Sequence, residues 1–264
     1  MDWHNHGEAF KLFETGDYEQ ALAKFSLLAE LEPDLVDKAT LLQRQCLCLL
    51  RLGRFDDARL RVIAAKRLAG KNEWLLADLE FAEACLLQSE GREEESLAMM
   101  ERLLKSRREV FEHSECRYLY EALQEKRAFV LTHLGRYSEA ISLLEEALSF
   151  SMNADERSDL YHYLGICHYE SGDHAAAVEA LLTALRLSPN RNEVAKTHFW
   201  LGRGCFHLRE FRKAKESFIA CERQLQVGKS GPAKADLYKW LAATCSQLGE
   251  TQAAALYTSM ARPV

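Results

Sequence analysis

The amino-acid sequence predicts an all-α fold, a solenoid in which antiparallel helix pairs stack on one another. A helix-breaking turn recurs seven times, at intervals of 37, 38, 44, 37, 37 and 40 residues. Small residues stand at fixed distances before and after these turns, and the four prolines fall only at expected helix boundaries. A period of this length is typical of solenoids, in which each unit buries its apolar face only against its neighbours.

The turns set the register of the repeats. They are centred on Gly16, Gly53, Gly91, Gly135, Gly172, Arg209 and Gly249. Five residues later stand Ala21, Ala58, Ser96, Ala140, Ala177, Ala214 and Ala254. Seven residues earlier stand Ala9, Cys46, Ala84, Ala128, Gly165, Gly202 and Ala242. Because small side chains let two helices approach closely, each turn is expected to join the two helices of one pair.

Larger residues recur after the turns as well. Two residues after them stand Tyr18, Phe55, Tyr137 and Phe211, with Glu93, His174 and Thr251 as weaker members. Nine residues after them stand the expected core residues Phe25, Val62, Met100, Leu144, Leu181, Phe218 and Thr258. The residues nine positions after the turns are expected to supply the larger side chains of the core.

In this register the chain divides into seven successive helix pairs. Their approximate ranges are 2–34, 39–72, 77–110, 121–153, 158–190, 195–227 and 234–264. Because such units add linearly, all 264 residues are expected to form one domain, 1–264. Extra length is expected in long first helices and in loops at 106–116 and 226–233.

The pattern resembles the tetratricopeptide repeat, whose hallmark is Trp-x2-Leu-Gly-x2-Tyr followed by Ala, Phe, Ala and a closing Pro. The best match is provided by Tyr161, Leu164, Gly165, Ala177, Ala184 and Pro189. The third unit is degenerate, with Glu93 and Ser96 at two of its signature positions. The resemblance implies a right-handed superhelix whose concave groove is lined by the first helix of each unit.

The resemblance also implies which residues face that groove. The candidates are Gln43, Leu47, Arg51, Phe81, Gln88, Glu125, Phe129, His133, His162, Ile166, Tyr169, Lys196, Phe199, Arg203, Phe206, His207 and Lys239. An apolar floor with basic residues at intervals suits a peptide that carries apolar anchors and an acidic group or a carboxyl terminus. The alternative is that some of these aromatic residues only pack against the next unit.

Charge argues against nonspecific nucleic-acid binding, since the net charge is −6 and the isoelectric point is near 5.9. One basic segment stands out in the second unit, with Arg51, Arg54, Arg59, Arg61, Lys66, Arg67 and Lys71. It is expected to be a solvated face with alternating charges, and the alternative is a docking patch for an acidic partner.

No run of residues is apolar enough to cross a membrane, and the N-terminus lacks a basic segment followed by an apolar stretch, so a cytoplasmic protein is expected. Seven of the eight cysteines fall at helix positions that favour packing over disulfides or metal binding. Cys116 is the candidate for an exposed thiol. No catalytic or phosphate-binding motif is found, so no enzyme, cofactor or metal site is expected.

Two functional classes remain open. The first is a non-catalytic scaffold or adaptor that binds a peptide segment of a partner protein in the groove. The second is a peptide-gated regulator, or a chaperone of a secretion or assembly system. Apolar residues at the two ends, Leu256 and Met260 at one and Trp3, Phe10 and Phe13 at the other, also leave open a homodimer through the terminal repeats.

Overall fold

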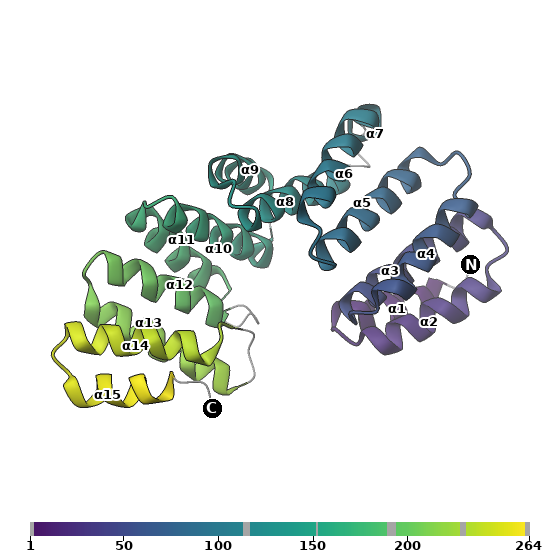
Figure 1. The fold of residues 1–264 in the computed structure, drawn as a ribbon. Coiled ribbons are helices and arrows are strands. Elements are labelled where there is room, and N and C mark those ends of the chain that lie inside the picture. Colours follow the sequence, from purple (N-terminus) through teal and green to yellow (C-terminus); the bar gives the residue numbers. More distant parts are fainter. Residues whose placement is uncertain (1–2, 113–116, 152, 189–193, 228–230, 262–264) are drawn as a thin grey trace. The chain divides into compact units, whose positions relative to one another are not determined.

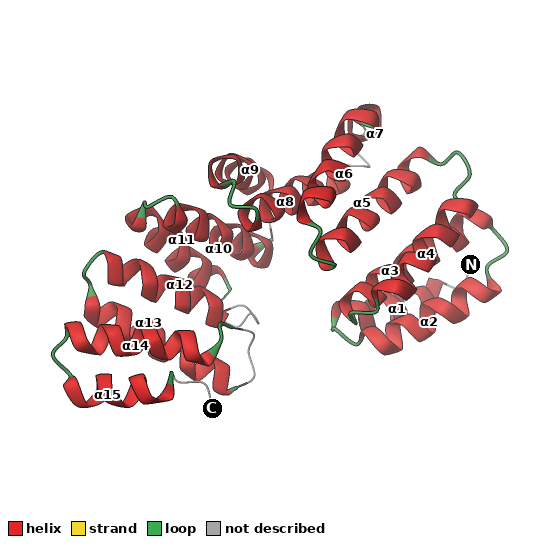
Figure 2. Cartoon of the chain, viewed as in Figure 1, coloured by secondary structure: helices red, strands yellow, loops and turns green. Residues whose placement is uncertain are grey.

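The computed structural model describes residues 3–112, 117–151, 153–188, 194–227 and 231–261, and over these residues it contains helices, turns and short loops but no strands (Figures 1 and 2). The first helices of the seven pairs are α1 (Trp3–Glu14), α3 (Leu35–Arg51), α5 (Glu73–Ser89), α8 (Arg117–His133), α10 (Ala154–Glu170), α12 (Val194–His207) and α14 (Lys234–Gln247). The second helices are α2 (Tyr18–Leu31), α4 (Phe55–Leu68), α6 (Glu93–Ser106), α9 (Tyr137–Phe150), α11 (His174–Leu187), α13 (Phe211–Gln226) and α15 (Thr251–Met260). The all-helical prediction is therefore confirmed.

The second helices follow the turns at a constant distance. Each begins at the residue two positions after its turn, including the weaker members Glu93, His174 and Thr251. Every turn also makes the same backbone hydrogen bond across five residues, such as Asp17 N to Leu12 O, and its length is 2.9 Å in all seven. This bond caps the end of a first helix when the central residue takes a left-handed conformation.

Six of the turns reach this conformation with a glycine, and the sixth turn reaches it with Arg209, whose φ is 62°. Arg209 is the one non-glycine residue with positive φ among the described residues. The same bond forms there, from Glu210 N to Cys205 O at 2.9 Å. A side chain in this conformation costs about 1–2 kcal/mol, so the hydrogen-bonded turn holds Arg209 in a strained backbone state.

The small positions lie where the two helices of a pair meet. A Cβ atom on Gly165 would stand 2.5 Å from Leu181 Cγ, and one on Gly202 would stand 2.6 Å from the Phe218 ring. In the third pair Ser96 donates its hydroxyl to Ala84 O at 2.6 Å, which satisfies a polar group at the equivalent contact. The core residues nine positions after the turns are fully buried, with the exception of Thr258, which is exposed.

The chain divides by its internal packing into two compact parts, each larger than a single repeat. They are called unit 1, residues 1–130, and unit 2, residues 131–264, and the boundary lies inside α8. In unit 1, α2 packs on α3, α4 packs on α5, and the first helices α3 and α5 also touch. In unit 2, α11 packs on α12 and α13 packs on α14, while α10 touches α12 and α12 touches α14. A face built from successive first helices therefore exists within each unit, and one continuous domain over 1–264 stays a prediction.

The extra length is distributed partly as expected. The first helices α3, α5, α8 and α10 have 17 residues each, whereas the second helices α2, α4, α6, α9 and α11 have 14. The segment 106–116 is not simply a loop, because it contains the short helix α7 (Arg108–Glu112), which packs against α5 and α6. The start of α7 is tied down by Arg107, which forms an ion pair with Glu80 at 2.6 Å.

Candidate functional site

The most densely built site in unit 2 surrounds Arg203 of α12. Its guanidinium carbon lies 4.2 Å from the centre of the Trp200 ring, 4.5 Å from Tyr169, 5.3 Å from Trp240 and 5.8 Å from Phe199. These rings come from three successive first helices, α10, α12 and α14. Aromatic faces attract a cation within about 6 Å, so this cluster, the Arg203 site, fixes the guanidinium in place.

Part of the hydrogen-bonding capacity of Arg203 is used by the Tyr169 hydroxyl, and part is free. Its Nε is enclosed and has no hydrogen-bond partner, and the side chain is 21% exposed. The nearest carboxylate is that of Glu170, whose Oε1 lies 3.9 Å from Nη1, at the outer limit of an ion pair. A planar guanidinium that is held by rings and has a free N–H group can donate to a ligand carboxylate with little loss of side-chain freedom.

Two stacked histidines lie beside the Arg203 site. The rings of His174 and His207 are 4.5 Å apart with an interplanar angle of 24°, and Tyr169 lies edge-on to His207. Burial, together with the charges of His174 and Arg203, lowers the pKa of His207. Burial also raises the pKa of the Tyr169 hydroxyl, an effect that the Arg203 charge opposes. Both rings therefore stay neutral near pH 7 and contribute shape and hydrogen bonds rather than charge.

Of the predicted groove residues in unit 2, Tyr169, Phe199, Arg203, Phe206 and His207 come together at this site. Phe206 packs edge-on against the Trp240 ring, with centroids 5.3 Å apart. Tyr169 and Phe199 are themselves largely buried by these contacts. The sequence therefore predicted the centre of the cluster, and the groove role of these residues stays a prediction.

The other predicted residues of unit 2 differ in exposure and in contacts. His162 is 6% exposed, and its Nδ1 lies 2.9 Å from Thr197 Oγ1 of α12, so packing between α10 and α12 occupies this side chain. Ile166 and Lys196 are half-buried, and His133 is exposed. Lys239 is exposed and pairs with Asp236 on its own helix at 3.0 Å.

In unit 1 the predicted residues range from buried to exposed. Gln43 is 2% exposed, and its Oε1 has no hydrogen-bond partner. Arg51 is exposed, and the remaining candidates are half-buried: Leu47, Phe81, Gln88, Glu125 and Phe129. Unit 1 thus offers a more polar and less aromatic face than unit 2.

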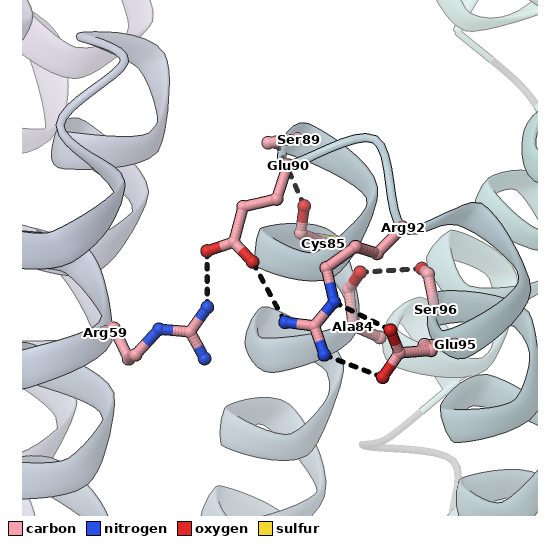
Figure 3. A network of polar contacts seen from close by, with 8 residues as sticks. All are labelled: Arg59, Ala84, Cys85, Ser89, Glu90, Arg92, Glu95 and Ser96. Carbon is pink, nitrogen blue, oxygen red and sulfur yellow. Dashed lines mark hydrogen bonds and ion pairs between the residues drawn. The ribbon is translucent and has the colours of Figure 1, made fainter.

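Three side chains of the basic segment in the second repeat form ion pairs, namely Arg54, Arg59 and Lys66, and Figure 3 shows the network that includes Arg59. Glu90 forms ion pairs with Arg59 of α4 and, at 3.2 Å, with Arg92, which also pairs with Glu95 at 2.6 Å. Lys66 of α4 pairs with Glu83 of α5 at 2.6 Å. These contacts support the expectation of a face with alternating charges, because two of the basic side chains tie α4 to the next helix pair.

Several residues of the described chain were not predicted from sequence. Trp200, Trp240 and His174 complete the Arg203 site, although they fall outside the groove positions carried over from the repeat. Asp78, which is only 7% exposed on α5, was also missed. It occupies the second position of the third repeat, 77–110, as Gln43 and Phe81 occupy the fifth positions of theirs. The register that gave those two candidates would therefore also have given Asp78.

The cysteines behave as packing residues wherever they are described. Cys46, Cys48, Cys167, Cys205, Cys221 and Cys245 are buried, and Cys85 is half-buried. Burial raises the pKa of Cys46 to about 12 and that of Cys48 to about 11, which disfavours the reactive thiolate. Cys116 lies outside the described residues.

The described ranges lack two further features, a metal-binding cluster and a membrane-spanning helix. No group of three or more histidine, cysteine, aspartate or glutamate side chains there could hold a metal ion. None of the helices there has the length and apolar character needed to cross a bilayer.

Comparison with known families gives a match to the tetratricopeptide repeat model over residues 119–190. Among curated proteins, the photosystem I assembly protein Ycf3 of Synechococcus elongatus is 33% identical over 72 residues, which are 26% of this chain and 42% of Ycf3. Ycf3 of a second Synechococcus strain matches to the same extent. The match thus spans less than half the length of these relatives.

Solved structures resemble the chain over much more of its length. The structure reported for Pseudomonas aeruginosa pilF matches with a TM-score of 0.65 and 19% identity, over 85% of this chain and 90% of that one. Apo RapI matches with a TM-score of 0.72 and 15% identity, over 98% of this chain and 75% of the RapI chain. A tetratricopeptide repeat protein from Parabacteroides merdae matches with a TM-score of 0.58 and 16% identity, over 98% of this chain and 91% of that one. At these identities the likeness extends to the fold alone.

Proposed function

Because this chain is a tetratricopeptide repeat protein, we propose that it is a non-catalytic scaffold that binds a peptide segment of a partner protein along its first helices. The Arg203 site carries the proposal. It presents a fixed cation within an aromatic surface, and rigid aromatic and arginine side chains are the residues that dominate binding energy in protein interfaces. The ligand chemistry that fits is a peptide with an acidic group or a carboxyl terminus next to an apolar side chain.

The physical basis is the guanidinium of Arg203, whose Nε has no hydrogen-bond partner. Rings on several sides exclude water from part of the cation, and charge interactions are stronger where the effective dielectric constant is lower. A ligand carboxylate would form the charge-assisted hydrogen bonds that the distant Glu170 does not fully supply. Apolar ligand groups would cover Phe206 and Trp240, which are half-buried on the same face.

Selection from a displayed library of random peptides tests this proposal. The wild-type chain is expected to enrich peptides with an acidic residue or a free carboxyl terminus beside an aromatic or aliphatic residue. Arg203→Glu is expected to weaken a selected peptide by at least about tenfold, or about 1.4 kcal/mol, because it replaces attraction by repulsion.

The matched control is Arg212→Glu, which makes the same charge change at an exposed position on α13. Circular dichroism would establish that both variants keep the wild-type helix content. Equal peptide affinity for the wild type and Arg203→Glu, with unchanged helicity, would refute the Arg203 site as the binding surface.

A second candidate function is an adaptor or chaperone of an assembly system. The match to a photosystem I assembly protein over 72 residues favours it. A chaperone of this kind would bind a whole client subunit, so the selected peptide would displace the client only in part. A competition experiment with a client isolated on the immobilised chain separates the two functions. Complete displacement supports the peptide scaffold, and residual binding supports the assembly adaptor.

Self-association through the terminal repeats stays a proposal of its own. Leu256 is 58% exposed and Met260 is 42% exposed on α15, so they form an apolar pair at the surface. At the other end, Phe10 is already engaged with Phe25, their ring centres being 5.5 Å apart. Sedimentation equilibrium of wild type and Leu256→Glu tests the homodimer, since only a dimer through α15 would be weakened by that charge.

A further inference from the structure

The stacked rings of His174 and His207, called the histidine pair below, are more than the packing of the repeat requires. His174 fills a position that is held by tyrosine or phenylalanine in other pairs, namely by Tyr18, Phe55, Tyr137 and Phe211. Its Nδ1 is enclosed and has no hydrogen-bond partner. An unsatisfied polar atom is costly, and phenylalanine would fill this space without that cost. The pair therefore calls for an explanation other than packing.

The histidine pair and Arg203 belong to one continuous surface. Arg203 and His207 are four residues apart on α12, so they lie on the same face of that helix. The Tyr169 ring lies 4.5 Å from the guanidinium carbon and 5.5 Å from the His207 ring. The Trp240 ring lies 5.3 Å from the guanidinium carbon and 6.1 Å from the His207 ring. Because His207 is exposed and the Arg203 side chain is 21% exposed, one ligand can reach both.

The histidine pair can change its charge near neutral pH, unlike Arg203. In the free chain burial lowers the pKa of His207, and the charges of His174 and Arg203 lower it further. The two ring centroids are 4.5 Å apart, so a proton on one ring disfavours a second proton on the other. The pair is thus neutral at pH 7 and gains a single charge as the pH falls.

The acids around the histidine pair are engaged elsewhere. On α10, Glu170 has its Oε1 3.9 Å from Nη1 of Arg203. Asp173, next to His174, accepts a hydrogen bond from Ala176 N at 3.0 Å. Glu210, at the start of α13, pairs with Lys213 at 3.0 Å.

The remaining neighbours bring no negative charge at neutral pH. Burial raises the pKa of Tyr169 on α10, which keeps its hydroxyl protonated. Trp240 on α14 is uncharged, and Arg209, in the turn after α12, is an exposed cation. A proton on the histidine pair would therefore find its best counter charge in a ligand.

We infer that the histidine pair is a second acid-binding point beside Arg203, and that it takes up a proton from solvent when a peptide places a second acidic side chain against His207. The inference rests on the proposed function of the Arg203 site and narrows its ligand to an extended segment with acidic residues at alternate positions. Four residues of helix separate Arg203 from His207 by about 6 Å along the axis. Alternate residues of an extended chain, whose side chains share one face, are about 6.6 Å apart.

Proton uptake makes the affinity depend on pH, with a defined sign. A ligand carboxylate favours the charged ring, so the pKa of His207 is higher in the complex than in the free chain. Affinity then rises as the pH falls through the interval between those two values, and a rise of one pKa unit corresponds to a tenfold gain. Ordinary carboxylates stay ionised down to about pH 5, so the ligand keeps its charge over this interval.

Histidine ring titration by NMR on the full chain tests the inference. The probe N-acetyl-Glu-Phe-Glu-amide has two acids at alternate positions, and its matched controls, with Gln in place of either Glu, have one. The two-acid probe is expected to raise the pKa of His207 by about half a unit to one unit, and the one-acid controls by less than about 0.2 unit. It is also expected to bind about three- to tenfold more tightly at about pH 5.5 than at about pH 7.5.

A pair of variants locates the proton. His207→Gln should retain binding of the two-acid probe through Arg203 and lose the pH dependence. His168→Gln, the same change at a half-buried position of α10, should keep it. A pH dependence that survives in His207→Gln would contradict the inference.

Binding itself is followed independently by the indole N–H signals of Trp200 and Trp240. If the two-acid probe shifts these signals with the same affinity at every pH, the inference is overturned and the proposed function stands. If no probe shifts them at any pH, the proposed function of the Arg203 site fails and the inference fails with it.

Discussion

In unit 1, the contact between α4 and α5 includes the ion pair of Lys66 with Glu83, and Arg59 reaches the end of α5 at Glu90. In unit 2, the equivalent contacts between successive pairs are made by rings: Tyr169 meets Trp200 with centroids 5.3 Å apart, and Phe218 stacks on Trp240 at 6.1 Å. Unit 2 has an ion pair of this kind as well, between Lys215 and Glu250, but rings dominate its shared faces.

The difference also appears in how closely the two helices of a pair approach. The small positions of α1, α3 and α5 are Ala9, Cys46 and Ala84, which all carry a Cβ atom. Those of α10 and α12 are glycines, and Leu181 and Phe218 fill the space where a side chain would stand. Helices of the same repeat thus form two kinds of interface. Those of unit 1 contain ion pairs, and those of unit 2 contain closely packed large side chains. Unit 1 should accordingly respond to salt and pH, and unit 2 to changes in side-chain size.

The largest expected effect tests the packing of unit 2. Gly202→Val places a branched side chain where even a Cβ atom would lie 2.6 Å from the Phe218 ring. We expect a loss of about 3 kcal/mol in the free energy of unfolding, because overpacking forces the ring and the two helices apart. Urea unfolding followed by the fluorescence of Trp200 and Trp240 measures it. Gly7→Ala on α1, with open space around the site, is the control and should be neutral or slightly stabilising.

The next effect concerns the buried carboxylate of unit 1. Asp78→Leu is expected to stabilise the free chain by about 2 kcal/mol at pH 7, since an acid whose pKa is raised to about 6 is costly to keep ionised. A raised acid pKa means that the folded chain binds the proton more tightly, so wild-type stability rises as pH falls from about 7 to about 4. The advantage of the variant should shrink over the same window. Unfolding curves at several pH values measure the free energies of unfolding of the wild type and the variant. A difference between them that stays constant with pH would contradict the raised pKa of Asp78.

A smaller effect distinguishes the two kinds of turn. Arg209→Gly is expected to stabilise unit 2 by about 1 kcal/mol, because glycine adopts the positive φ of this turn without steric cost. The larger chain entropy of unfolded glycine offsets part of that gain. Gly172→Arg, the reverse change in the preceding turn, should destabilise by a similar amount. Thermal unfolding measures the pair, and equal shifts of the same sign would refute the argument.

The smallest effect tests the ion-pair network of unit 1 in Figure 3. Glu90→Gln is expected to cost about 0.5–1 kcal/mol at low salt and less at high salt, because partly exposed ion pairs are weak and screened. Hydrogen bonds from Arg59, the largest cause, hold the pKa of Glu90 below its usual value. Such a group stabilises above its unfolded pKa, and that contribution is lost as pH falls through the folded one. Glu94→Gln, an exposed neighbour, is the control in the same salt and pH series.

How much of this could be predicted from sequence follows from the physics of each feature. The turns and the small residues are local signals at fixed offsets, so the helical repeat could be recognised from sequence, and each second helix begins at a constant distance after its turn. The short helix α7 could not be predicted in this way, because it depends on Arg107 reaching Glu80 across 27 positions of sequence. Gly70, which also takes a positive φ, ends α4 outside the repeated pattern.

The candidate sites were predicted less completely because exposure depends on neighbours from other repeats. The register placed Tyr169 and Arg203 on a shared face, but it did not reveal that Trp200 and Trp240 would enclose the guanidinium. It placed His162 on the groove, whereas a hydrogen bond to Thr197 holds that ring between α10 and α12.

The seven identical turn bonds bear on how the chain folds. Each joins residues only five positions apart, so closing it requires little ordering of the chain, and the helices it links then meet their nearest neighbours in sequence. Every pair can therefore nucleate without waiting for a distant segment. Whole pairs are also natural units of gain and loss, so that an insertion in the short connection between Leu31 and Leu35 should leave the hairpins on both sides able to form.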